Sequence, residues 1–147
     1  MTPSLQSSQR TILMADDDED DRDLAQDAFR AAGLTGQLRF VLDGQELVDD
    51  LRGVAGSPAP EQPAIILLDL NMPRMDGREA LAEIKADESL CDIPVVVLTT
   101  STDDQDIRRS YRLGANSFIA KPVTHAHLVD VMRDLAKYWF DVVELPE

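Results

Sequence analysis

Four short apolar runs of this 147-residue sequence each end at a polar or charged side chain. The residues that follow these runs are Asp16 and Asp17, Asp69, Thr99, and Lys121. Short apolar runs of this kind are typical of strands that are buried on both faces of a parallel sheet. Because the carboxyl ends of such strands lie at one edge, where ligands bind, we expect these groups to form one site.

The chemistry of this set favours phosphoryl transfer. Three carboxylates, from Asp16, Asp17 and Asp69, would repel one another and raise their pKa values. Mg²⁺ would remove that penalty, and it keeps coordination positions for water or a phosphoryl oxygen. Lys121 adds a second positive charge and Thr99 adds a hydroxyl donor. The set predicts that Asp69 is a nucleophile that forms an acyl phosphate.

The elements that must position these groups alternate between strands and helices. Strands are expected at residues 11–15, 38–42, 64–68, 95–99 and 117–120. The first helix is expected at residues 21–32, with Leu24 on its buried face, and the second begins after Asp43 as its N-cap. The third is expected at 77–87, the fourth from Asp103 or Asp104 to Leu113, and the last from Thr124 to about Phe140. This order predicts an α/β fold with a doubly wound, five-stranded parallel sheet of the flavodoxin-like kind.

Composition and charge limit the functional classes. The net charge of −14 disfavours nucleic acids and anionic membranes as partners and favours cations or basic surfaces. Residues 1–10 are polar and are expected to form a disordered leader before a single domain at 11–140, with an extension at 141–147. Cys91 is the single cysteine, so no intrachain disulfide is possible, and a cytoplasmic location is expected.

The acidic run after residue 15 has other interpretations. Asp20 or Asp21 would serve as a cap of the first helix. The spacing of Asp16, Asp18 and Asp20 also suggests a calcium-binding EF-hand loop, but Asp21 stands where that loop needs glycine. The EF-hand interpretation is therefore disfavoured.

Over residues 11–140 the sequence resembles the receiver domain of two-component response regulators. Asp16 and Asp17 match the acidic pair of that family, Asp69 its phosphoacceptor and Thr99 its switch hydroxyl. Lys121 and Pro122 match its Lys-Pro pair. The spacing also fits, with Thr99 30 residues and Lys121 52 residues after Asp69.

The resemblance implies roles for these residues. Asp17 and Asp69 would bind Mg²⁺ through their side chains, Asn71 through its backbone carbonyl, and Asp16 through water. The Lys121–Pro122 bond would be cis. The phosphoryl donor would be a phosphohistidine on a sensor histidine kinase.

The resemblance also implies a conformational switch. The phosphoryl group would attract Thr99 and Lys121, and the movement of Thr99 would open space for Phe118, the switch aromatic. Phe118 stands where the family often has tyrosine, and Thr100 stands where it often has a smaller residue. The output would pass through the surface formed by the fourth helix, fifth strand and last helix.

A narrower resemblance connects residues 98–101 and 139–146 with the response regulators of phytochrome-type photoreceptor kinases. The sequence ends about 25 residues after Lys121, so output through a protein surface is expected rather than through a further domain. Apolar residues continue past the usual end of the last helix, which predicts a homodimer. The expected interface residues are Leu135, Trp139, Phe140, Val143 and Leu145.

Two other functions fit parts of the sequence. A phosphatase of the haloacid-dehalogenase kind would need a general acid two residues after the nucleophile, where this sequence has Asn71. The second alternative is a constitutive receiver-fold dimer or scaffold that phosphorylation does not regulate. The acidic residues, Thr99 and Lys121 are all present, which favours a receiver that is phosphorylated.

Overall fold

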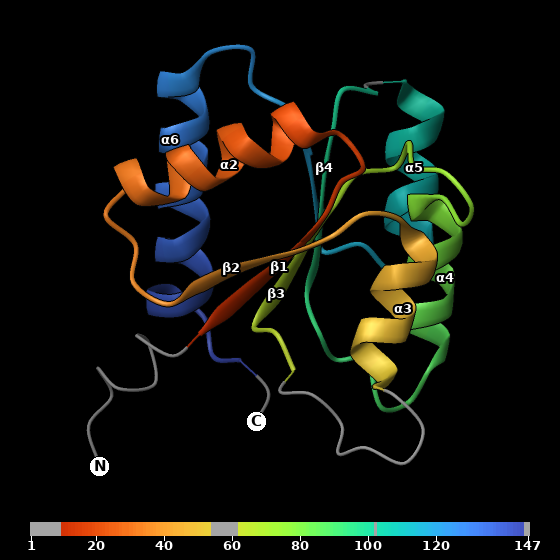
Figure 1. The fold of residues 1–147 in the computed structure, drawn as a ribbon. Helices are drawn as coiled ribbons and strands as arrows, with labels where there is room; N and C mark the ends of the chain where they lie inside the picture. Colours follow the sequence, from red (N-terminus) through yellow and green to blue (C-terminus); the bar gives the residue numbers. More distant parts are fainter. Residues whose placement is uncertain (1–9, 54–61, 102, 146–147) are drawn as a thin grey trace.

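The computed structural model describes residues 10–53, 62–101 and 103–145, and these form one parallel sheet with helices on both faces (Figure 1). The strand order is β2-β1-β3-β4-β5, which confirms the predicted doubly wound, flavodoxin-like arrangement. The strands are β1 (Thr11–Ala15), β2 (Gln37–Val41), β3 (Ile65–Leu68), β4 (Val95–Thr99) and β5 (Ser117–Ala120).

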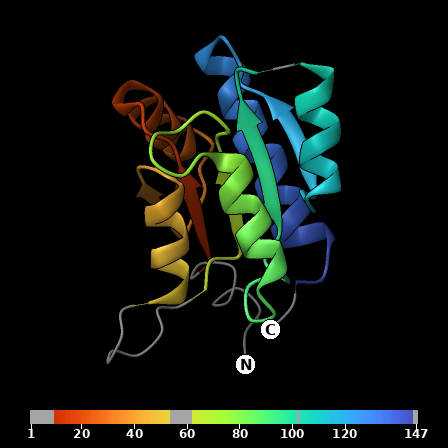
Figure 2. The same cartoon turned by 90° about the vertical axis from the view of Figure 1, so that its right-hand side faces the viewer.

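The helices divide between the two faces of the sheet. They are α2 (Glu19–Ala31), α3 (Gly44–Arg52), α4 (Gly77–Ala86), α5 (Asp104–Arg112) and α6 (His125–Ala136), with a π-helical segment η1 (Lys137–Val142) after α6. Helices α2 and α6 cover one face, and α3, α4 and α5 cover the other (Figures 1 and 2).

The strands are continuously apolar because both of their faces are buried. Alternate side chains of a strand point to opposite faces. Leu13 and Ile66 therefore pack in the cluster under α3 and α4, whereas Ile12 and Leu67 pack in the cluster under α2 and α6. This arrangement requires the strands to be nearly free of polar residues until they leave the sheet.

The first helix begins earlier than predicted. Asp18 is its N-cap, and the Asp18 carboxylate accepts a hydrogen bond from the amide of Asp21 at 3.1 Å. Neither Asp20 nor Asp21 is the cap, because both lie inside the first turn. Leu24 is 47% exposed, whereas Ala25, Ala28 and Phe29 of the same helix are buried, so the predicted burial of Leu24 is wrong.

The other predicted helix starts agree well with the structure. Asp43, Asp103 and Thr124 are the N-caps of α3, α5 and α6. The last helix, however, is α-helical only to Ala136 and continues as η1. No peptide bond in the described residues is cis, so the Lys121–Pro122 bond is trans, the form that X–Pro bonds favour intrinsically, and the expectation of a cis bond is wrong.

The described residues include only part of the two predicted terminal segments. The predicted leader lies, except for Arg10, outside the described residues, as do residues 146 and 147 of the extension. No helix in the described part of the chain has the length and apolar character needed to cross a bilayer.

Candidate functional site

The register of β1 and β3 places Asp16 beside Asp69. Ala15 and Leu68 are paired across the two strands, and the ladder continues past them, because the Asp69 amide donates to the Ala15 carbonyl at 3.1 Å. Asp16 is fully buried and Asp69 is 7% exposed. The two strand ends therefore bring two carboxylates together inside the protein, as the sequence predicted.

Asp17 completes an acidic cluster with these two residues. Carboxylate oxygens of Asp16, Asp17 and Asp69 all lie within 4.8 Å of one another, and Asp17 is exposed to solvent. Such a set of hard oxygen donors fits a divalent cation. Asn71 lies two residues after Asp69, and its backbone amide donates a hydrogen bond to Asp69 Oδ1 at 3.2 Å.

Lys121 lies at the centre of the carboxylates. Its Nζ donates to Asp16 Oδ2 at 2.7 Å, to Asp21 Oδ2 at 2.8 Å and to Asp69 Oδ2 at 2.9 Å. Burial alone would lower the pKa of Lys121, but the hydrogen bonds to the three carboxylates outweigh it and raise the pKa above its usual value. Lys121 is therefore a fixed positive charge at neutral pH.

Asp21 is a site residue for which the sequence pattern indicated only helix capping. It reaches Lys121 because α2 begins at Glu19, two residues before it. A signal was available: a cap at Asp18 would have placed Asp21 in the first turn, directly beside the strand ends. Burial raises the pKa of Asp16 above its usual value, although the Lys121 hydrogen bond acts in the opposite direction.

Thr99 contacts the other oxygen of Asp69. The buried Thr99 hydroxyl donates to Asp69 Oδ1 at 2.9 Å. Each carboxylate oxygen of Asp69 is therefore held by a group from a different strand end: the hydroxyl at the end of β4 and the ammonium after β5. The predicted convergence of Asp69, Thr99 and Lys121 is present in the structure.

A set of polar contacts leads away from Thr99 toward two helices. The Ser101 amide lies 3.4 Å from Thr99 Oγ1, and the Ser101 hydroxyl is hydrogen-bonded to the Asp106 carboxylate. Asp106 also forms an ion pair with Arg78, with Nη2 to Oδ1 at 2.6 Å. Polar contacts thus connect α5 and α4 to the site through the end of β4.

The remaining predicted residues lie farther from the carboxylates. Phe118 is half-buried and packs against the core under α3 and α4. Leu135 is 6% exposed and packs in the core under α2 and α6, where Trp139 and Phe140 also make partly buried contacts. The guanidinium of Arg10, the residue before β1, lies 5.4 Å from the centre of the Phe140 ring, so η1 is near the amino ends of the strands.

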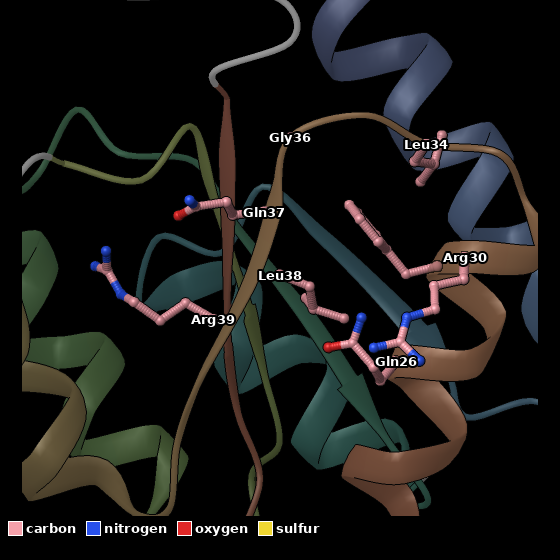
Figure 3. A pocket seen from close by; sticks show the side chains of 8 residues that line it. Gln26, Arg30, Leu34, Gly36, Gln37, Leu38 and Arg39 are labelled. Carbon is pink, nitrogen blue, oxygen red and sulfur yellow. The ribbon is translucent and has the colours of Figure 1, made fainter.

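A pocket of about 420 Å³ lies between α2 and β2, away from the acidic cluster. Gln26, Arg30, Leu34 and Leu38 line it, and Figure 3 shows these side chains on the side of β2 that faces α2. None of the site carboxylates, Thr99 or Lys121 belongs to its lining. The pocket is therefore separate from the site at the strand ends.

Comparison with known proteins agrees with this geometry. The model of the "Response regulator receiver domain" family matches residues 12–133. A curated relative, the probable methanogenesis regulatory protein FilR2 of Methanothrix harundinacea, is 40% identical over 128 residues, covering 87% of this chain and 82% of its own. The response regulator Rcp1 of Synechocystis is 35% identical over 137 residues, covering 93% of both chains.

Solved structures give the same result. The phosphorylated cyanobacterial phytochrome response regulator RcpA has a TM-score of 0.87 and 37% identity, covering 95% of this chain and 99% of its own. The Mn²⁺-bound form of Rcp1 has a TM-score of 0.83. With the matched family model, the strand order and the acidic cluster in agreement, the chain belongs to the response regulator receiver domain family.

Proposed function

We propose that this protein accepts a phosphoryl group on Asp69 from the phosphohistidine of a sensor histidine kinase and then switches a protein-interaction surface. One observation supports this more than any other. Asp69 has a hydroxyl on one carboxylate oxygen and an ammonium on the other, each at 2.9 Å. Acceptance of a phosphoryl group needs a nucleophile whose neighbours stabilise added negative charge.

The transfer itself requires little covalent chemistry from the protein. One carboxylate oxygen of Asp69 attacks phosphorus, and the phosphorus–nitrogen bond to the kinase histidine breaks. The electron pair of that bond stays on the imidazole, and the phosphoryl group is now an acyl phosphate on Asp69. Lys121 and the Thr99 hydroxyl are then free to donate hydrogen bonds to phosphoryl oxygens instead of to the carboxylate.

A divalent cation fits the acidic cluster, and we infer that it is Mg²⁺. Asp17 and Asp69 would hold it through their carboxylates, Asn71 through its carbonyl, and Asp16 through water. When bound, the cation neutralises negative charge on the phosphoryl oxygens during transfer. The dense set of carboxylates in the structure supports binding of a divalent cation, as does the Mn²⁺-bound form of the relative Rcp1.

The output follows from movement of Thr99. A phosphoryl group on Asp69 attracts the Thr99 hydroxyl, which changes its contact with the Ser101 amide. Phe118, half-buried on the neighbouring strand β5, then moves into the space that Thr99 leaves. Phosphorylation acts here as a local charge change that biases two arrangements of one surface.

The similarity to RcpA and Rcp1 favours a phytochrome-type kinase as the phosphoryl donor. A homodimer remains a prediction, and the structure removes one residue from its predicted interface. Leu135 already packs in the core of the single chain, so Trp139, Phe140, Val143 and Leu145 are the better candidates. A cytoplasmic location remains the expectation from the single cysteine.

We infer that the protein is a phosphoacceptor rather than a turnover enzyme, with at most slow loss of its own phosphoryl group. Asn71 stands where a phosphatase of the haloacid-dehalogenase kind has its general acid. The scaffold alternative, in which phosphorylation has no role, is separated from our proposal by experiment.

The test is phosphotransfer from autophosphorylated histidine kinases, including phytochrome-type kinases, with Mg²⁺ present. We expect rapid transfer of label from one kinase to the wild-type chain and none to Asp69→Asn. Asp87→Asn serves as the control, because Asp87 is the C-cap of α4, outside the loop that follows Asp69, and is not part of the acidic cluster. Equal labelling of Asp69→Asn and wild type, or no labelling by any donor including acetyl phosphate, would contradict the proposal.

A further inference from the structure

The loop that carries Asp69 contains an arginine in an unusual backbone conformation. We call residues 69–76 the phosphoacceptor loop. Arg74 has a φ angle of 62°, and it is the one residue other than glycine with positive φ in the described ranges 10–53, 62–101 and 103–145. A residue with a Cβ atom adopts this region only where the surrounding structure holds it there.

Asp43 is the residue that holds Arg74. Arg74 Nε lies 2.9 Å from Asp43 Oδ2, and Arg74 Nη2 lies 3.1 Å from Asp43 Oδ1. Two parallel bonds of this kind fix the orientation as well as the distance of the partners. Asp43 is itself fixed, because it is 6% exposed and its carboxylate caps α3 by accepting from the Glu46 amide at 2.8 Å.

Two backbone contacts fix the rest of the phosphoacceptor loop. The Gly44 amide donates to the Met75 carbonyl at 2.8 Å, and a Cβ atom on Gly44 would lie 2.2 Å from that carbonyl oxygen. The Gly77 amide donates to the Leu70 carbonyl at 2.9 Å. The loop is thus joined to the first turns of α3 and α4, the two helices that lie beside each other in Figure 2.

We propose that the Asp43–Arg74 ion pair positions Asp69 and the carbonyl of Asn71. The pair holds Arg74 in the left-handed conformation, and this conformation sets the path of the chain between Asn71 and α4. Asp43 and Arg74 are not part of the acidic cluster, so their role is that of positioning residues. This inference rests on the proposed function, since the loop matters for phosphorylation only if Asp69 is the acceptor.

Glycine at position 74 separates this role from a purely electrostatic one. Glycine adopts positive φ without strain, so Arg74→Gly keeps the loop conformation without the ion pair. Arg74→Ala removes the pair and retains the strain. If instead the positive charge of Arg74 acted directly on the cation, both variants would bind the cation more tightly and to the same extent.

The experiment measures Mn²⁺ affinity by electron paramagnetic resonance and the rate of phosphorylation by acetyl phosphate with Mg²⁺, on the full chain. For Arg74→Ala we expect weaker Mn²⁺ binding and slower phosphorylation, each by about tenfold. For Arg74→Gly we expect values within about twofold of wild type. If Arg74→Ala and Arg74→Gly had the same Mn²⁺ affinity and the same phosphorylation rate, whether above, below or equal to those of wild type, the proposal would be overturned.

Asp43→Asn supplies an independent test, because asparagine still caps a helix but does not form the charged pair. In the wild-type background we expect Asp43→Asn to lower the Mn²⁺ affinity and the phosphorylation rate by about fivefold. In the Arg74→Gly background we expect less than about twofold, because glycine adopts positive φ without an ion pair. A similar loss in both backgrounds would assign the effect to α3 capping and overturn the proposal.

Asp50→Asn is the matched control. It breaks the 2.8 Å ion pair between Asp50 of α3 and Arg39 of β2, which does not involve the phosphoacceptor loop. We expect it to leave both readouts unchanged. If wild type binds Mn²⁺ but is not phosphorylated, the proposed function fails, whereas the Mn²⁺ affinities of the variants still decide whether the ion pair positions the loop.

Discussion

The two loops that border Asp69 are held in different ways. The phosphoacceptor loop is joined to α3 and α4 by backbone hydrogen bonds at Gly44 and Gly77 and by the Asp43–Arg74 ion pair. The β4–α5 loop, residues 100–103, is described except for residue 102, and it contacts Thr99 and Asp106 through Ser101. Asp69, the proposed nucleophile, thus lies on a loop joined to two helices by backbone hydrogen bonds, while Thr99, the proposed switch hydroxyl, borders a loop whose described contacts involve side chains.

This difference matches what a switch needs. A nucleophile must keep its position for transfer, whereas the element that reports phosphorylation must have two arrangements of similar free energy. Side-chain hydrogen bonds can be exchanged one at a time. At Gly44 and Gly77, by contrast, a backbone carbonyl oxygen lies 2.2 Å from the place that a Cβ atom would take, so backbone packs directly on backbone there and leaves no room for a side chain. The two loops therefore separate positioning from reporting.

Lys121→Met is expected to have the largest effect, because it breaks the site that both loops share. Three carboxylates would lose their common partner, and an unpaired buried charge is costly. In metal-free buffer we expect the free energy of unfolding to fall by about 3 kcal/mol, measured by urea denaturation. Added Mg²⁺ should restore part of it, and an unchanged midpoint would show that Lys121 is not the charge partner.

Gly77→Ala should damage the phosphoacceptor loop specifically. The new Cβ atom would lie 2.2 Å from the Asp69 carbonyl oxygen, so the backbone of Asp69 must move. We expect a loss of about 2 kcal/mol in unfolding free energy together with loss of phosphorylation by acetyl phosphate.

Gly33→Ala is the control for that variant. Its φ is +72° but nothing lies within 4 Å of its Cβ position, so it is strained without crowding the site. It should lose stability and retain phosphorylation. If Gly77→Ala were phosphorylated at the wild-type rate, this interpretation of the phosphoacceptor loop would be wrong.

Asp106→Asn tests the β4–α5 loop alone. The change breaks the ion pair with Arg78 and weakens the contact with Ser101. We expect amide hydrogen exchange to speed up about tenfold at residues 100–106 and to stay constant at residues 70–77. Faster exchange in both segments would mean that the two loops are one unit.

The pH dependence of stability gives a smaller effect with a defined sign. The Ser101 hydrogen bond, followed by Arg78, lowers the pKa of Asp106 below its usual value of 3.8. A lowered pKa means that the contribution of Asp106 is complete above pH 3.8 and is lost as pH falls through the folded-state pKa. Wild type should therefore be more stable than Asp106→Asn at neutral pH, and this difference should shrink as the pH falls into the acid range. A difference that grows in acid would contradict the lowered pKa of Asp106.

The convergence of Asp69, Thr99 and Lys121 could be predicted from the sequence because parallel topology alone brings strand ends to one edge. The role of Asp21 did not follow from apolar periodicity, because it depends on a helix that starts earlier, at the Asp18 cap. The Asp43–Arg74 pair joins residues 31 apart in the sequence, and no local pattern marks it.

The carboxyl-terminal segment shows the limit of periodicity in another way. Apolar spacing predicted a helix to about Phe140, and the chain is helical there, but residues 137–142 are π-helical. The same spacing placed Leu135 in an interface, although it packs in the core of the single chain. A recurring apolar residue thus shows that a side chain is covered, but not which surface covers it.

The most direct test is to locate the phosphoryl group chemically. The protein is treated with acetyl phosphate and Mg²⁺, reduced with borohydride, which converts an aspartyl phosphate to homoserine, and sequenced by tandem mass spectrometry. We expect homoserine at position 69 alone, and none when the donor or Mg²⁺ is omitted. Homoserine at another aspartate, or none at any position, would contradict the assignment of Asp69 as the phosphoacceptor.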